Sequence, residues 1–263
     1  MVLSSGVLKS YRYLLNHHEN RRNLNVRTRI RPGEECKTIH GRNVRAHYSY
    51  RLHALPAFHR ELHGSSTSLG FRVDLDGGPG IVISGDTALA REPSSLDCAD
   101  LANAYRGAGL VILHVGSLET DGRRLKEHLG LAGVAGILKK MCDLGAPAKL
   151  VVLSEWGYEF GRLGVEGRTR FTRLVVDELC QQGCSRYFAA VKGAEVPAAD
   201  QIPIFPADVG LRIRLPDLGI WVLSEGFVDA KDARAHEYPD RIEYVSRVAP
   251  SPEADWTDSA ETP

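Results

Sequence analysis

Residues 109–117 have the sequence GLVILHVGS, a short apolar run bounded by glycines. The stretch AKLVVLSEWG at 148–157 repeats this pattern, and IVIS at 81–84 is a third apolar run. Consecutive apolar residues of this length predict strands that are buried on both faces of a sheet. Between these runs, residues 96–107 and 131–144 carry apolar side chains at helical spacing. Strands that alternate with helices predict an α/β layer architecture.

Further elements are expected on both sides of these runs. GFRVDL at 70–75 alternates in polarity and leads through the turn DGGPG into IVIS, which predicts a β-hairpin. HYSYRLHALPAF at 47–58 looks extended, and Pro56 indicates an edge strand or a strand end. The remaining expectations are a short helix at 5–16, an amphipathic helix at 168–182, a strand at 186–191 and a closing hairpin at 211–224.

The composition of the 263 residues excludes several classes of protein. With 43% apolar and 25% charged residues, the chain matches globular proteins rather than disordered or fibrous ones. Five cysteines without a C-x-x-C pair argue against a disulfide framework and against a zinc ribbon. They indicate reduced thiols in a cytoplasmic protein. No apolar run approaches the roughly 20 residues of a membrane span, and the first residues lack the order of a signal peptide.

Charge and composition divide the chain into three expected parts. Residues 1–45 are polar and Arg-rich, and we expect a basic N-terminal segment that is only partly ordered. Residues 46–248 hold the predicted strands and helices and form the expected domain. Residues 249–263 are acidic and rich in proline, which predicts a disordered tail. The net charge is zero, so the balance of the whole chain points to no particular partner.

Acidic residues and histidines follow the predicted strands, where open α/β sheets place their ligands. Asp86 follows IVIS, His114 ends VILH, and Glu155 follows LVVLS. His128 precedes a predicted helix, and His59 follows the extended stretch. Each alone is more often structural, because aspartate there frequently caps a helix. Together, in this order, they predict a metal site or an acid/base site.

The segments IVISGDT, GLVILHVGS, EHLGLAGVAGILKK and KLVVLSEWG, in this order, resemble the second half of the metallo-β-lactamase fold. They are most similar to its phosphodiesterase-like branch, which includes the tRNA 3′-processing endonucleases. The resemblance covers roughly residues 45–160. It implies an α/β protein that forms the C-terminal half of a four-layer αββα sandwich. It also implies metal-dependent hydrolysis, of a phosphodiester, with two divalent ions in the complete fold.

The resemblance also assigns roles to residues. Asp86 corresponds to the aspartate that bridges two metal ions, and it would belong to the catalytic centre. His128 corresponds to the helix-leading histidine that holds the scissile oxygens or protonates the leaving group. A further ligand precedes the strand Gly70-Phe71-Arg72 of the hairpin. His59 and His63 both fit that place, and the A-F-H-x-E-L context favours His59.

Two departures from the family pattern bear on the chemistry. Glu155 stands where most of the fold has a histidine, and a carboxylate there favours manganese or iron without excluding zinc. The H-x-H-x-D-H cluster, which supplies most metal ligands of the complete fold, does not occur in these 263 residues. The upstream histidines lack its spacing; they are His17, His18, His40, His47 and His53.

Three interpretations follow from the missing cluster: a split-enzyme subunit, a fragment, or a non-catalytic binding module with relic ligands. A half-sandwich leaves an apolar sheet face and a sheet edge to be covered. We therefore expect an N-terminal half-domain chain or a second copy of this chain as partner. A phosphodiester or a nucleic acid is the expected substrate, and a membrane is not an expected partner.

Overall fold

The structure is a computed structural model. It describes residues 2–4, 28–30, 39–43, 48–57, 59, 69–89, 97–118, 128–157, 160, 163–184, 188–190, 200–207, 211–215, 218–223 and 242–246. The predicted helix at 5–16, His63 and the predicted tail at 249–263 lie outside these residues.

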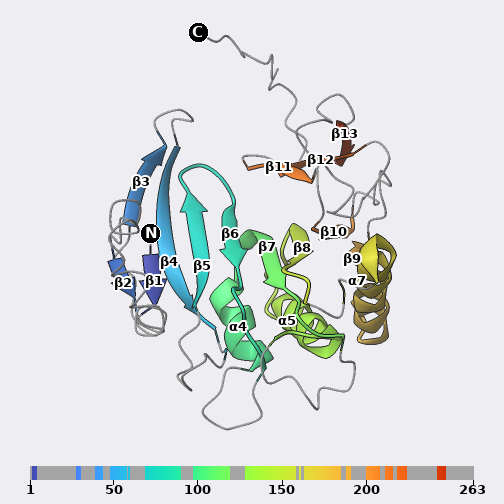
Figure 1. The fold of residues 1–263 in the computed structure, drawn as a ribbon. Coiled ribbons are helices and arrows are strands. Elements are labelled where there is room, and N and C mark those ends of the chain that lie inside the picture. The colour runs from blue at the N-terminus through green and yellow to red at the C-terminus, as the bar shows by residue number, and fades with distance from the viewer. Residues whose placement is uncertain are drawn as a thin grey trace, which may run out of the picture.

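An eight-stranded mixed sheet dominates the described part of the chain (Figure 1). Four strands on one side are antiparallel to their neighbours, and from β6 onward the neighbours are parallel. The predicted α/β class is thereby confirmed. In spatial order the strands are β3 (Ile39–Asn43), β4 (Tyr48–Pro56), β5 (Leu69–Leu75), β6 (Gly80–Ile83), β7 (Ala108–His114), β8 (Leu150–Ser154), β10 (Ile202–Pro206) and β9 (Phe188–Ala190).

Two smaller sheets accompany the large one. The first joins β1 (Val2–Ser4) and β2 (Thr28–Ile30) in parallel. The second has three antiparallel strands, β11 (Arg212–Arg214), β12 (Gly219–Leu223) and β13 (Ile242–Ser246). The expected closing hairpin is present as β11 and β12.

Three helices pack on one face of the large sheet: α4 (Cys98–Tyr105), α5 (Leu131–Asp143) and α7 (Gly164–Gln181). Their apolar stripes form one core with the inward residues of the parallel strands, such as Val111 and Val151. Figure 1 shows the three helices along this face. None of the helices in the described ranges combines the length and the hydropathy that a membrane crossing requires.

The other face of the sheet carries a second, smaller apolar cluster. Ile81, Leu110 and Val152 are buried there beneath Leu218 and Ile220, which belong to the β11–β12 hairpin. Towards β5 the same face is only partly covered, and Val73 is half-buried. The helices therefore cover one face of the parallel strands, whereas the other face keeps apolar surface accessible.

The hairpin β5–β6 fixes the loop that carries Asp86. Gly85 has a φ of +63°, a left-handed conformation that favours glycine, and a Cβ there would overlap the carbonyl of Leu69. A Cβ on Gly70 would lie 2.6 Å from the carbonyl oxygen of Ser84. Only glycines allow the start of β5 to approach the end of β6 this closely. The close approach holds the S-G-D segment against the sheet edge.

Candidate metal centre

The topology brings the ends of four strands to one edge of the sheet. Strands β6, β7 and β8 are parallel neighbours, so their carboxyl ends lie at the same edge. Strand β4 is separated from β6 by one antiparallel strand and therefore points in the same direction. Asp86, His114 and Glu155 follow or end the first three strands, and His59 follows β4. This edge is where parallel α/β sheets bind ligands.

His128 reaches the same edge through a short bridge. Leu129 pairs in parallel with Val115, directly after β7. The backbone N–H of Gly116 donates to the carbonyl of Leu129 at 3.2 Å. Helix α5 begins two residues later, at Leu131. The bridge thus holds the residue before it, His128, beside the end of β7.

Three of the predicted residues converge at this edge: His59, Asp86 and His128. One ligand atom from each can be chosen such that all three lie within 4.8 Å of one another. The ring centroids of the two histidines are 5.0 Å apart, with the rings tilted by 46°. His59 and His128 are half-buried and Asp86 is exposed, so the group is accessible to solvent. A histidine pair and a carboxylate from three distant segments form a compact donor set.

The donor set fits a divalent metal ion. Imidazole nitrogens and carboxylate oxygens bind zinc at about 2.0–2.2 Å in a tetrahedral arrangement, which places two ligand atoms of one ion about 3.4 Å apart. The ligand atoms of this group lie within 4.8 Å of one another. Rotations of these solvent-accessible side chains would bring the atoms to the ligand spacing. His59, Asp86 and His128 are therefore the residues that would hold the ion.

His114 orients the carboxylate of Asp86. Its Nδ1 lies 3.3 Å from Asp86 Oδ1. Because an ionised carboxylate only accepts, the Nδ1 must carry the proton in this contact. The hydrogen bond from His114 lowers the pKa of Asp86 below its ordinary value, against the effect of partial burial, and the nearby His128 and His59 act in the same direction. Asp86 is thus kept in the ionised form that binds metal.

A buried serine couples the strand ends that carry these two residues. The Ser84 hydroxyl accepts the backbone N–H of His114 at 3.0 Å and donates to the carbonyl of Gly85 at 2.9 Å. Ser84 is fully buried. The end of β6 and the end of β7 are thereby fixed relative to each other, and with them Asp86 and His114.

The loop after β7 provides a close fit for His128. A Cβ on Gly116 would overlap the His128 side chain, and a Cβ on Gly157 would overlap the carbonyl of Gly116. The backbone N–H of Gly157 donates to the carbonyl of Val115 at 3.0 Å. His128, Gly116 and Gly157 are therefore stacked in contact, and no larger residue fits at either glycine without displacing its neighbour.

The structure does not bring Glu155 into the group of three. Glu155 is exposed, follows β8, and has a φ of +51°, a left-handed conformation that is rare outside glycine. Its strand neighbour Ser154 pairs in register with His114. Glu155 therefore lies at the same edge of the sheet as Asp86, at the end of β8, the strand next to β7. His63, the alternative to His59, lies outside the described residues.

The contact between His114 and Asp86 was not among the roles predicted from the sequence. The sequence placed His114 in the predicted site by its position at a strand end, without a partner for its side chain. The register of β7 against β6 decides the contact, because Ile83 pairs with Ile112 and the next residues continue towards each other. A polar residue at the end of each of two adjacent parallel strands was the available signal.

Neither a protein-family profile nor a curated protein matches this chain. Solved structures that are similar to it include the metallo-β-lactamase fold protein YhfI from Bacillus subtilis, at 12% identity and a TM-score of 0.40, over 73% of this chain and 59% of that protein. Human tRNase Z, short form, is similar at 22% identity and a TM-score of 0.31, over 42% of this chain and 38% of that protein. Igni18, a metallo hydrolase from Ignicoccus hospitalis, is similar at 13% identity and a TM-score of 0.32, over 52% and 47%.

The chain thus spans less than two thirds of the length of each of these three proteins.

Proposed function

We propose that this chain binds a divalent metal ion through His59, Asp86 and His128 and serves a metal-dependent hydrolase of phosphodiesters. The observation that carries the proposal is the convergence of these three side chains, which are separated by 27 and 42 residues in the sequence. The SGDT segment and its order relative to the other motifs support the phosphodiester class. The four described cysteines are free thiols, which fits a cytoplasmic location.

A divalent ion in this place supplies a Lewis acid that polarises a phosphoryl group and lowers the pKa of a water molecule. The residues of the chain prepare that chemistry. Asp86 offers an ionised carboxylate whose position is fixed by the N–H of His114. His128, packed on Gly116, presents a ring nitrogen to the same space. His59 completes the set, with its ring beside that of His128.

Two roles can be assigned to His128, that of a proton donor and that of a metal ligand. The resemblance implies a proton donor, whereas the geometry makes its ring nitrogen available as a ligand. We assign it the ligand role in this chain. His128→Ala should then weaken metal binding as strongly as His59→Ala does. Unchanged affinity in His128→Ala would leave the proton-donor role.

The test is a calorimetric titration of the chelator-treated chain with Zn²⁺ and with Mn²⁺. We expect one ion per chain, and at least a tenfold weaker affinity in Asp86→Asn, because a neutral amide is a poor ligand. The matched control is Asp76→Asn, which changes an exposed aspartate in the β5–β6 turn and should bind as the wild type does. Equal affinity in Asp86→Asn and the wild type would refute the site.

A second candidate function is a binding module or split-enzyme subunit without turnover of its own. The described residues offer three ligands in one group, and the sequence contains no H-x-H-x-D-H. Without the second ion, half of the phosphoryl clamp is missing. We therefore expect little hydrolysis of bis(4-nitrophenyl) phosphate by this chain, even in excess manganese or zinc. Robust turnover that disappears in Asp86→Ala would instead show further ligands in this chain.

A further inference from the structure

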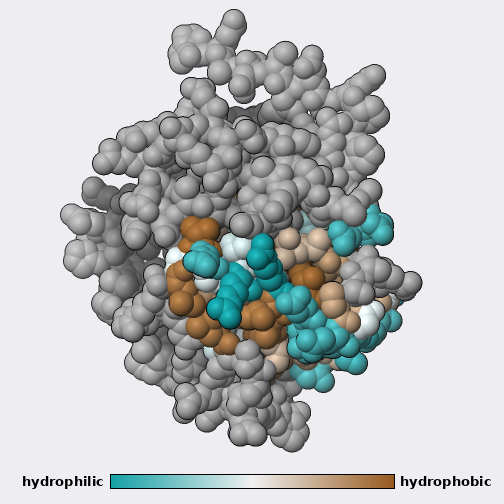
Figure 2. Space-filling model, turned by 90° about the vertical axis from the view of Figure 1, so that its right-hand side faces the viewer, coloured by the Kyte–Doolittle hydropathy of each residue, from teal (hydrophilic) through white to brown (hydrophobic). Residues whose placement is uncertain are grey.

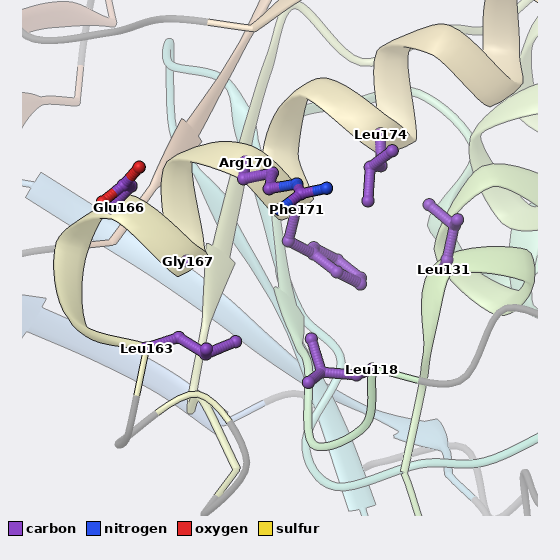
Figure 3. A pocket seen from close by; sticks show the side chains of 8 residues that line it. All are labelled: Leu118, Leu131, Leu163, Glu166, Gly167, Arg170, Phe171 and Leu174. Atoms are coloured by element: carbon purple, nitrogen blue, oxygen red, sulfur yellow. The ribbon is translucent and has the colours of Figure 1, made fainter.

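A pocket of about 310 Å³ opens between the first half of α7, the start of α5 and the loop after β7. Its walls are apolar: Leu118, Leu131, Leu163, Phe171 and Leu174 contribute to them. Figure 3 shows these side chains directed towards one common space. The volume lies at the lower end of the range for small-molecule sites.

Two of the leucines that border the pocket are exposed to solvent. Leu163 is 48% exposed and Leu174 is 40% exposed, and both border the pocket. Single exposed leucines are common, but two that face one hollow leave a contiguous apolar surface in water. Figure 2 shows this apolar area, crossed by hydrophilic side chains, on the side of the molecule where α7 lies. An apolar ligand group would remove that surface from water.

The floor of the pocket is closely packed. Phe171 is 2% exposed and packs edge-on against Phe160 at 5.1 Å and against Trp156 at 5.9 Å between ring centroids. The indole N–H of Trp156 donates to the carbonyl of Ala207 at 3.2 Å. These contacts join the floor to α7 and to the ends of β8 and β10, and such close packing favours a preformed hollow.

Among the described residues that line the pocket, one carries a positive charge, Arg170. Arg170 is exposed, and its guanidinium extends across Phe171 towards Leu174 (Figure 3). Glu166 points away from the other lining side chains in the same view. Both residues line the pocket, but only the guanidinium extends over the apolar walls, so Arg170 is placed to pair with an anionic group on a ligand whose apolar part enters the pocket.

The pocket is next to the candidate metal centre. Leu131 follows His128 by three residues, which limits the distance between their Cα atoms to about 11 Å. Leu118 follows His114 by four residues in the loop that contacts His128. The two segments that hold the metal-binding side chains thus also line the pocket.

We propose that this pocket binds the apolar group of the substrate, and that the substrate is a small amphiphilic anion whose negative charge pairs with Arg170. The inference rests on the proposed metal site, which would act on the polar part of the same molecule. It selects an alkyl or aryl ester-type anion over a nucleic-acid strand. The side groups of such a strand are bases, and the hydrogen-bond donors and acceptors on their edges would be left unpaired against five apolar walls.

Binding is tested first with the metal-free chain and octanoate, by calorimetry in the presence of a chelator. We expect one molecule per chain and an affinity that rises about fourfold per methylene from hexanoate to octanoate. Leu174→Trp, which fills the mouth, should weaken octanoate binding at least tenfold. Arg170→Gln should weaken it by up to about fivefold while leaving 1-octanol binding unchanged. Arg173→Gln, an exposed arginine on the same helix outside the pocket, is the matched control.

The relation to the metal is tested separately with Mn²⁺. In the loaded wild type, the protons of bound octanoate should relax faster than in the metal-free chain, and Asp86→Asn should abolish that increase. Absence of Mn²⁺ binding would refute the proposed function alone, because the metal-free titration still tests the pocket. No octanoate binding, or equal binding in wild type and Leu174→Trp, would overturn the pocket. Octanoate that binds without enhanced relaxation would overturn its assignment to the substrate, and displacement of octanoate by a single-stranded oligonucleotide would favour a nucleic acid.

Discussion

The position of His128 depends on the residue opposite it being a glycine. A Cβ on Gly116 would overlap the His128 side chain. Gly116→Ala should therefore displace the ring and weaken Zn²⁺ or Mn²⁺ binding at least tenfold, while the far-UV circular dichroism stays that of the wild type. Calorimetry measures the affinity. Metal affinity that is unchanged in a folded Gly116→Ala protein would show that His128 is not held by this contact.

Glu155 adopts a backbone conformation that is unfavourable for its residue type. Its φ of +51° costs a non-glycine residue about 1 kcal/mol. Glu155→Gly should therefore raise the free energy of unfolding by about that amount, measured by urea denaturation, whereas Glu155→Gln should leave it unchanged. The same two variants test the ligand role that the sequence predicted, because both remove the carboxylate. Since Glu155 lies outside the group of His59, Asp86 and His128, both variants should bind metal as the wild type does, and equal weakening in both would restore Glu155 to the ligand set.

At this scale the sequence predicted the types of residue but not all of their contacts. Asp86 and His128 were marked by motifs, and His59 was chosen over His63 by local context. The structure brings Asp86, His128 and His59 together. The contact of His114 with Asp86 depends on strand register, which a single sequence does not specify.

Helix α4 begins at a capping box. The Asp97 carboxylate accepts the backbone N–H groups of Ala99 and Asp100 at 2.7 and 2.9 Å, and the Asp100 carboxylate accepts the N–H of Asp97 at 3.1 Å. Asp97→Ala should lower the free energy of unfolding by about 1 kcal/mol. Asn103→Ala, at an exposed position in the same helix, is the control and should cause no loss. Equal urea midpoints for Asp97→Ala and the wild type would contradict the cap.

The elements with clear periodicity were predicted well. The hairpin at 70–84 is present as β5 and β6, and the two longest predicted helices are α5 and α7, although α7 begins earlier, at Gly164. Strand β10 was not predicted. Its sequence IPIFP contains two prolines, which lack a backbone N–H and normally exclude a central strand. Strand β3, IHGRN, was also missed, because its sequence is short and polar. Its antiparallel pairing with β4 forms the strand, and a local sequence pattern does not reveal such pairing.

For the molecule as a whole, the two faces of the sheet differ. The helices cover one face, and the other carries a smaller cluster next to half-buried Val73 and Ile112. Burial of apolar surface contributes about 25 cal/mol per Å², so a few hundred square ångströms suffice to drive association. We propose that this face is covered by a second copy of the chain or by a chain that supplies the other half of the sandwich.

Sedimentation equilibrium of the purified chain tests that proposal. We expect a dimer, and Val73→Lys should shift it to a monomer because a charge would enter the apolar contact. Asn103→Lys, on the helical face, should leave the dimer intact. A wild-type monomer that unfolds cooperatively and binds no hydrophobic dye would mean that the chain closes its own core.

We propose that His59, Asp86 and His128 hold one divalent ion at the carboxyl edge of the sheet. Anomalous diffraction from crystals of the chain grown with Zn²⁺ or Mn²⁺ tests this assignment. We expect a peak at about 2.0–2.2 Å from a nitrogen of each histidine and from a carboxylate oxygen of Asp86. An ion that binds in solution but gives its peak at other residues, with none among these three, would contradict it.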